Sequence, residues 1–159
     1  MTHITLITVG SLKEPYLLAA VNEYTKRLSA YARVDTVELK EERINDEDNA
    51  REIREALRTE GERILRAVPK GAYTAALCVE GVAYDSVSLA EQLHRATDAC
   101  GRLCLIIGSS HGLCDEVKRA CDLRLSVSKL TFPHQLMRVL LLEILYRSFT
   151  ITAGKRYHK

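Results

Sequence analysis

Three short segments combine glycine, serine and charged residues directly after runs of apolar residues. They are residues 79–81 (Val-Glu-Gly), 108–112 (Gly-Ser-Ser-His-Gly) and 126–134 (Ser-Val-Ser-Lys-Leu-Thr-Phe-Pro-His). Glycine at both ends of the second segment lets the backbone approach a ligand without a Cβ clash. The third segment mixes polar and apolar residues, which suits a flat heterocycle held by main-chain hydrogen bonds and aliphatic contacts. We therefore expect a ligand site where these segments meet, although turns after strands also favour glycine for steric reasons alone.

The segment 108–112 also fits the G-x-S-x-G nucleophile elbow of α/β hydrolases. Ser110, Asp122 and His134 follow one another in the order of that family's catalytic triad. A small serine hydrolase that uses Ser110 is therefore one alternative function. The short chain and the lack of a recognisable upstream glycine loop for an oxyanion hole speak against it.

The C-terminal tail, residues 154–159, is the most locally basic part of the sequence and contains Tyr157 and His158. Together with Arg138 and Arg147 it could form a phosphate-binding surface with a stacking ring, as RNA-binding proteins use. The alternative is a frayed tail without a function.

The elements that position these segments follow from the hydrophobic pattern. Apolar runs predict strands at 4–9, 34–39, 73–79, 103–107 and 123–127, with a turn at Glu80-Gly81. Apolar residues at helical spacing predict five helices. They begin near Pro15, Asp46, Ser86, Asp115 and Pro133, and the fourth is short and ends at Cys121. The charge run of the helix after Asp46 is expected to be a solvated face. This alternation indicates one α/β domain over 1–159, with a mostly parallel sheet and helices on both faces. In such a sheet, ligands bind beyond the carboxyl ends of the strands, which is where the three segments fall.

Composition narrows the function classes. The chain has 159 residues, 47% of them hydrophobic and 28% charged, with a formal net charge of +2. That charge is too small to indicate nucleic acid or a membrane by itself. No Walker A, G-x-G-x-x-G or H-E-x-x-H motif occurs, and the 5 cysteines form no C-x-x-C, so no metal is expected. The cysteines are predicted to be buried apolar residues in a reducing cytoplasm, and we expect no signal peptide and no membrane span.

The last predicted helix is apolar all round its circumference, so it must be buried on more than one side. One side can cover the sheet, and the other would leave a larger apolar patch than monomers usually expose. We therefore expect a homodimer packed through this helix. The alternative is a monomer in which the N-terminal helix covers the second side.

The block Thr-Phe-Pro-His-Gln-Leu-Met-Arg-Val at 131–139 resembles the ribosomal RNA large subunit methyltransferase H family, which belongs to the SPOUT superfamily. Leu-Leu-Leu-Glu at 140–143, Leu-Tyr-Arg at 145–147 and the final Tyr-His-Lys extend the resemblance, as do Val9-Gly10 and Glu60-Gly61. The resemblance implies a trefoil-knotted, homodimeric α/β fold. It also implies transfer of a methyl group from S-adenosylmethionine (SAM) to N3 of a pseudouridine in large-subunit (23S) rRNA.

The resemblance also assigns residues. This family commonly has two adjacent glycines where this chain has Gly108-Ser109. Cofactor contacts carried over by position are Leu77, Gly108, Val127, Ser128, Lys129, Leu130, Thr131 and Phe132.

A catalytic hypothesis follows for the target base. Its N3 imide carries a proton that must leave before or during methyl transfer. We expect Arg138, Tyr157 and His158 to meet the base across the dimer, with His158 as the proton acceptor because histidine titrates near neutral pH. The small net charge predicts that the substrate is rRNA within the assembled ribosome rather than naked RNA. A non-catalytic SAM-binding module with the same loops is the other alternative.

Overall fold

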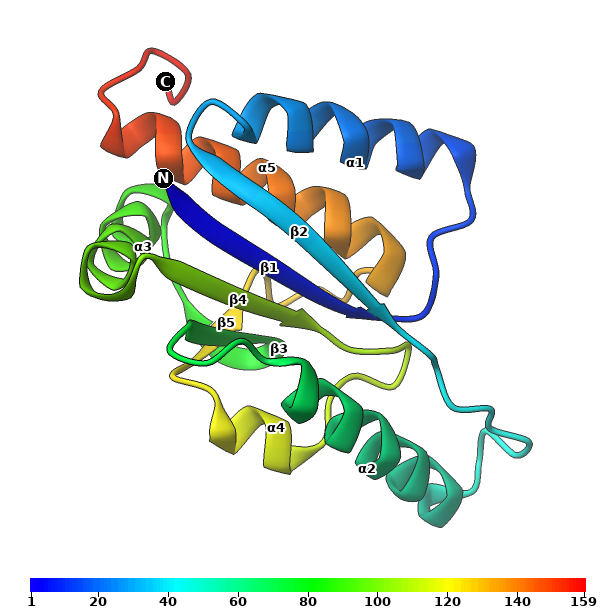
Figure 1. Cartoon of the computed structure of the whole chain (residues 1–159). Helices are drawn as coiled ribbons and strands as arrows, with labels where there is room; N and C mark the ends of the chain where they lie inside the picture. The colour runs from blue at the N-terminus through cyan, green and yellow to red at the C-terminus, as the bar shows by residue number, and fades with distance from the viewer.

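The computed structural model describes all residues, 1–159, as five strands and five helices that alternate along the chain (Figure 1). The strands are β1 (Thr2–Val9), β2 (Ala32–Leu39), β3 (Tyr73–Ala83), β4 (Arg102–Ile107) and β5 (Leu123–Ser126). The helices are α1 (Pro15–Leu28), α2 (Ala50–Ala67), α3 (Ser86–Cys100), α4 (Asp115–Ala120) and α5 (His134–Thr152). The predicted α/β class is confirmed.

All five strands form one parallel sheet in the order β2-β1-β4-β3-β5. Because the strands run in the same direction, their carboxyl ends meet at one edge of the sheet. The loops after β4 and β5 leave the sheet at this edge. The topology therefore brings together segments that are far apart in the sequence.

Helices cover both faces of the sheet, as predicted. Helices α1, α3 and α5 lie on one face, and α2 and α4 lie on the other (Figure 1). Alternate residues of a strand point to opposite faces. Leu6 of β1 therefore joins the core beneath α5, while its neighbour Ile7 joins a second core with Ile64 of α2 and Val117 of α4.

The predicted turn at Glu80-Gly81 is wrong. The chain stays extended to Ala83, and the pairing of β3 with β5 shifts register between Leu77 and Val82. A Cβ atom on Gly81 would lie 2.6 Å from the carbonyl oxygen of Arg124 in the segment beside it. Glycine here permits close approach of the two strands across a bulge instead of ending the strand.

Helix α5 is buried on its sheet side and flanked by two helices. Its Leu141, Leu142 and Leu145 are fully buried, and α1 and α3 pack along its sides. Phe149 of α5 stacks on Tyr31, which follows α1, at 6.2 Å between ring centroids. The N-terminal helix thus covers one flank, as the monomer alternative anticipated.

Helix α2 begins later than the charge pattern predicts. Asn49 caps it, because its side chain accepts hydrogen bonds from the main-chain N–H groups of Arg51 (3.1 Å) and Glu52 (3.2 Å). Most charged residues of α2 face solvent as expected, but Glu60 is only 3% exposed. For Glu60 the prediction of a solvated face is wrong, because this residue falls on the same stripe as Leu57 and Ile64.

The five cysteines are all free thiols. Cys104 is buried, and burial raises the pKa of its thiol to about 12. Cys100, at the end of α3, is exposed, and Cys78, Cys114 and Cys121 are only partly buried. The prediction that the cysteines are buried is therefore confirmed for Cys104 alone. None of the helices combines the length and apolar character needed to cross a membrane.

Candidate cofactor site

A cavity of about 710 Å³ lies beside the carboxyl ends of β4 and β5 and the bulge of β3. Its size falls in the range of about 300–1,000 Å³ that is usual for cofactor and ligand pockets. All three segments singled out in the sequence contribute to its wall. Among the residues predicted to contact the cofactor, those lining the cavity are Leu77, Gly108, Val127, Ser128, Leu130, Thr131 and Phe132. Lys129 is not among the lining residues.

The glycine loop, residues 108–112, closes tightly on itself at one wall of the cavity. The N–H of Gly112 donates to the carbonyl of Ser109 at 2.9 Å. A Cβ atom on Gly108 would lie 2.2 Å from the carbonyl oxygen of Gly112, and Gly112 itself has a φ of +85°. Both glycines are therefore required by the shape of this loop, the first for space and the second for its conformation.

The loop between β5 and α5, residues 127–133, forms a second wall with free hydrogen-bonding groups. The hydroxyl of Ser126 donates to the carbonyl of Ser128 at 3.1 Å, and the N–H of Leu130 donates to the Ser128 hydroxyl at 3.0 Å. The main-chain N–H groups of Lys129, Thr131 and Phe132 donate to no atom of the chain. Thr131 and Phe132 line the cavity, so their N–H groups are available to the edge of a heterocycle.

An ion pair lies on the β3 side of the cavity. Lys118 of α4 donates a hydrogen bond to Glu80, and this bond holds the pKa of the Glu80 carboxyl below its usual range. The neighbouring thiol of Cys78 has a raised pKa, mainly because it is partly buried. The wall therefore presents a paired charge and a protonated thiol, and we see no nucleophile among them.

The residues of the hydrolase alternative do not form a triad. Asp122 precedes β5, at the opposite edge of the sheet from Ser110 and His134. Its carboxylate accepts hydrogen bonds from the N–H (2.8 Å) and hydroxyl (2.7 Å) of Thr74. Ser110 donates to Glu41 at 3.4 Å instead of to a histidine. The arrangement needed to activate the serine is absent.

Arg138 is buried rather than open to a substrate. It is 3% exposed, and its guanidinium donates to Glu38 at 2.9 Å and to the main-chain carbonyl of Gly10. These bonds tie the first turns of α5 to the ends of β1 and β2. Within one chain, Arg138 therefore supports the fold beside the cavity.

Tyr157 and His158 lie near the other end of α5. The Tyr157 hydroxyl donates to Glu143 at 2.8 Å, and the Arg147 guanidinium stacks over the Tyr157 ring at 4.7 Å. Partial burial and the hydrogen bond to Glu143 raise the pKa of Tyr157. His158 Nδ1 lies 3.4 Å from Arg147. Neither tail residue lines the cavity of its own chain.

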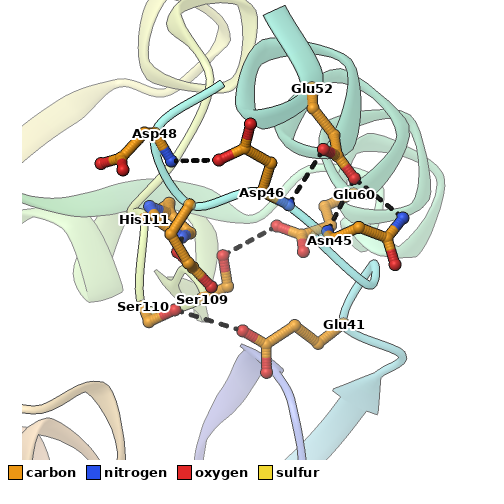
Figure 2. A network of polar contacts seen from close by, with 10 residues as sticks. Glu41, Asn45, Asp46, Asp48, Glu52, Glu60, Ser109, Ser110 and His111 are labelled. Carbon is orange, nitrogen blue, oxygen red and sulfur yellow. Dashed lines mark hydrogen bonds and ion pairs between the residues drawn. The ribbon is translucent and has the colours of Figure 1, made fainter. Parts of the chain in front are cut away.

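One residue beside the site escaped the sequence prediction. Glu60 lies next to the glycine loop and accepts a hydrogen bond from the Ser109 hydroxyl at 3.0 Å (Figure 2). The signal for it was a carboxylate on the apolar stripe of α2, four residues before Ile64. A buried acid in such a position needs a partner, and the partner is the glycine loop.

A family model and a solved structure identify the class of protein to which this chain is similar. Residues 2–158 match a family model described as "Predicted SPOUT methyltransferase". A Legionella pneumophila protein described as a "putative methyltransferase" and solved in complex with SAM has the same fold, with a TM-score of 0.51 at 14% identity. The similarity covers 91% of this chain, which spans only 65% of that longer protein.

Full-length relatives are more similar. Ribosomal RNA large subunit methyltransferase H of Bacillus pumilus is 43% identical over 158 residues, 99% of either chain. The protein of that name in Moorella thermoacetica is 44% identical over 160 residues, 100% of either chain. The chain therefore belongs to the ribosomal RNA large subunit methyltransferase H family of SPOUT methyltransferases.

Proposed function

We propose that this chain is a SAM-dependent methyltransferase that methylates N3 of a pseudouridine in 23S rRNA. The observation that carries the proposal is the cavity of about 710 Å³, which is lined by three segments that are far apart in the sequence. Unpaired main-chain N–H groups lie beside apolar side chains in its wall. The names of the full-length relatives support rRNA of the large subunit as the substrate. The position of the methyl group comes from the family resemblance.

The residues present fit SAM. The unpaired N–H groups at Thr131 and Phe132 would hold the adenine edge, while Leu77 and Leu130 would contact its faces. Bound SAM would supply a methyl group on a positively charged sulfur. The chain would then contribute orientation of the target nitrogen and exclusion of water rather than covalent chemistry.

We further propose that residues 1–159 act as one knotted domain within a homodimer. On α5, Leu136, Val139 and Leu140 are only half-buried in a single chain. A second copy packed against them would remove this apolar surface from water. The trefoil knot is proposed from family membership.

The dimer would complete the active site. Tyr157 and His158 do not line the cavity of their own chain. We propose that they reach the target base in the cavity of the partner, with His158 accepting the N3 proton. Arg138 was expected to touch the base as well. Its burial and its bonds to Glu38 and Gly10 favour a supporting role beside the cavity instead.

We propose the large ribosomal subunit, in the cytoplasm, as the physical substrate. A net charge of +2 provides little electrostatic attraction to naked RNA. Recognition would then depend on the shape of the ribosomal surface. Equal methylation of protein-free 23S rRNA and of ribosomes would contradict this part of the proposal.

Isothermal titration with SAM and with S-adenosylhomocysteine tests the cofactor site. We predict saturable binding of both ligands, and loss of at least about tenfold in affinity for Gly108→Ala, because the new Cβ would displace the carbonyl of Gly112. A thermal melt checks that the variant is folded. Absence of binding by the wild-type chain would contradict the proposed function. Binding without any methyl transfer would favour the non-catalytic module.

A further inference from the structure

Three consecutive residues of the glycine loop each contact a different glutamate. Ser109 donates to Glu60 at 3.0 Å, and Ser110 donates to Glu41 at 3.4 Å. His111 Nε2 lies 2.7 Å from the carboxylate of Glu47. Glu60 belongs to α2, whereas Glu41 and Glu47 belong to the β2–α2 loop, residues 40–49.

Helix α2 also holds the β2–α2 loop in place. Its Glu52 accepts hydrogen bonds from the main-chain N–H groups of Asn45 (2.7 Å) and Asp46 (3.2 Å), as Figure 2 shows. Its Glu60 accepts one from the N–H of Glu42 at 3.0 Å. Glu52 and Glu60 are eight residues apart, so they lie on the same side of the helix. The helix therefore supplies acceptors for a loop that has no strand partner of its own.

Glu60 is the point at which these contacts converge. One carboxylate oxygen binds the glycine loop through Ser109, and the other binds the β2–α2 loop through Glu42. Both Glu60 (3% exposed) and Ser109 (5% exposed) are buried, so water does not compete for these bonds. The helix that carries Glu60 is itself fixed, because its Gly61 packs directly against Cys114 at the start of α4.

We infer that Glu60 is a positioning residue, which acts through Ser109 to hold the glycine loop in the shape that binds the cofactor. Removal of either partner would free the loop between Gly108 and Gly112 and leave a buried polar group unpaired. The effect would fall on cofactor affinity, because Glu60 lines neither the cavity nor any surface open to the RNA. The inference rests on the proposed function, since SAM is the probe.

The test compares Ser109→Ala, Glu60→Ala and the double variant with Glu62→Ala, an exposed neighbour on α2 that serves as the matched control. Isothermal titration should show a Kd for SAM that is raised about tenfold in each single variant. In the double variant the Kd for SAM should also rise about tenfold rather than a hundredfold, because both substitutions break the same contact. The Kd of the control variant for SAM should stay within about twofold of the wild-type value.

Methyl transfer provides a readout that a general loss of structure would not reproduce. With ribosomes as the acceptor, the variants should have a raised KM for SAM and a kcat within about twofold of wild type. Wild-type affinity in folded Ser109→Ala and Glu60→Ala would overturn the inference, as would a multiplicative loss of SAM affinity in the double variant. If Glu60→Ala does not fold, Ser109→Ala decides alone. A wild-type chain that does not bind SAM would contradict the proposed function instead.

Discussion

Glu60 places an ionisable carboxyl group in the interior between α2, the glycine loop and the β2–α2 loop. Burial raises its pKa above the usual value, and the neighbouring carboxylates of Glu41 and Glu42 act in the same direction. The hydrogen bonds from Glu42 N–H and from Ser109 oppose this shift without cancelling it. The folded state therefore holds the proton of Glu60 more tightly than the unfolded chain does.

This shift predicts a pH dependence of stability. Because the folded pKa is raised, the contribution of Glu60 to the free energy of unfolding is full below the unfolded pKa and is lost as pH rises through the folded pKa. Glu60→Gln removes this titration. Urea unfolding across the acidic range should therefore show the stability of wild type, relative to Glu60→Gln, falling as pH rises.

The exposed Glu62→Gln variant is the control, since Glu62 pairs with Arg58 in solvent. It should show no comparable trend over the same pH range. If the difference in the free energy of unfolding between wild type and Glu60→Gln is constant with pH, the raised pKa of this buried carboxyl is contradicted.

At the residue scale, the sequence predicted the loops of the cavity because their main-chain conformation requires particular residue types. Glycine and mixed polar residues after strands identified the cavity loops, and Gly108 and Gly112 are needed there for reasons that glycine alone can meet. The partnership of Ser109 with Glu60 could not be predicted from spacing. It joins residues 49 positions apart, and only the packing of α2 against the glycine loop brings them together.

At the scale of elements, the packing of α2 on α4 depends on Gly61. An alanine in a helix usually stabilises it relative to glycine by about 1 kcal/mol. Here a Cβ atom would lie 2.4 Å from Cys114 Sγ and 3.2 Å from a Val117 methyl group. We therefore predict the opposite sign for Gly61→Ala, with about 1–3 kcal/mol lost from the free energy of unfolding.

A second substitution makes this prediction specific. Removing the sulfur with Cys114→Ala should restore part of the stability of Gly61→Ala, because the closest clash disappears. Urea unfolding of both single variants and the double variant measures the coupling. A stabilising Gly61→Ala, or no coupling between the two positions, would contradict the described packing.

Element-level prediction was accurate for order and type and weaker at boundaries. Hydrophobic periodicity found every strand and helix, because each strand contributes apolar residues to a core and each helix has a buried side. It failed at Glu80-Gly81, where glycine permits close strand approach rather than a turn. It also extended α2 back to Asp46, because charge alone does not distinguish a helix from the loop that Glu52 stabilises.

At the scale of the whole molecule, the proposed dimer makes each active site composite. A chain with Gly108→Ala would lack a cofactor site, and a chain with His158→Ala would lack the tail group. If the tail acts across the dimer, mixed dimers of the two inactive variants contain one intact site. Random mixing should then restore about a quarter of wild-type activity. No restoration in demonstrated mixed dimers would contradict action across the interface.

The association of two chains is harder to predict from the sequence than the elements of one chain. An apolar α5 shows that two sides must be covered, but α1 and α3 of the same chain account for much of that surface. The site of action of Tyr157 and His158 is set by association between chains, and neither composition nor spacing encodes a partner's position. Action across the dimer is proposed from family membership and because neither tail residue lines the cavity of its own chain.

The most direct test of the central proposal is transfer of a labelled methyl group from SAM to purified large ribosomal subunits that lack the modification. Digestion of the rRNA and mass spectrometry of its nucleosides then locate the label. We predict one N3-methylated pseudouridine per subunit with the wild-type chain and none with Gly108→Ala. A wild-type chain that binds SAM but leaves the rRNA unlabelled, or a label on another base, would contradict the proposal.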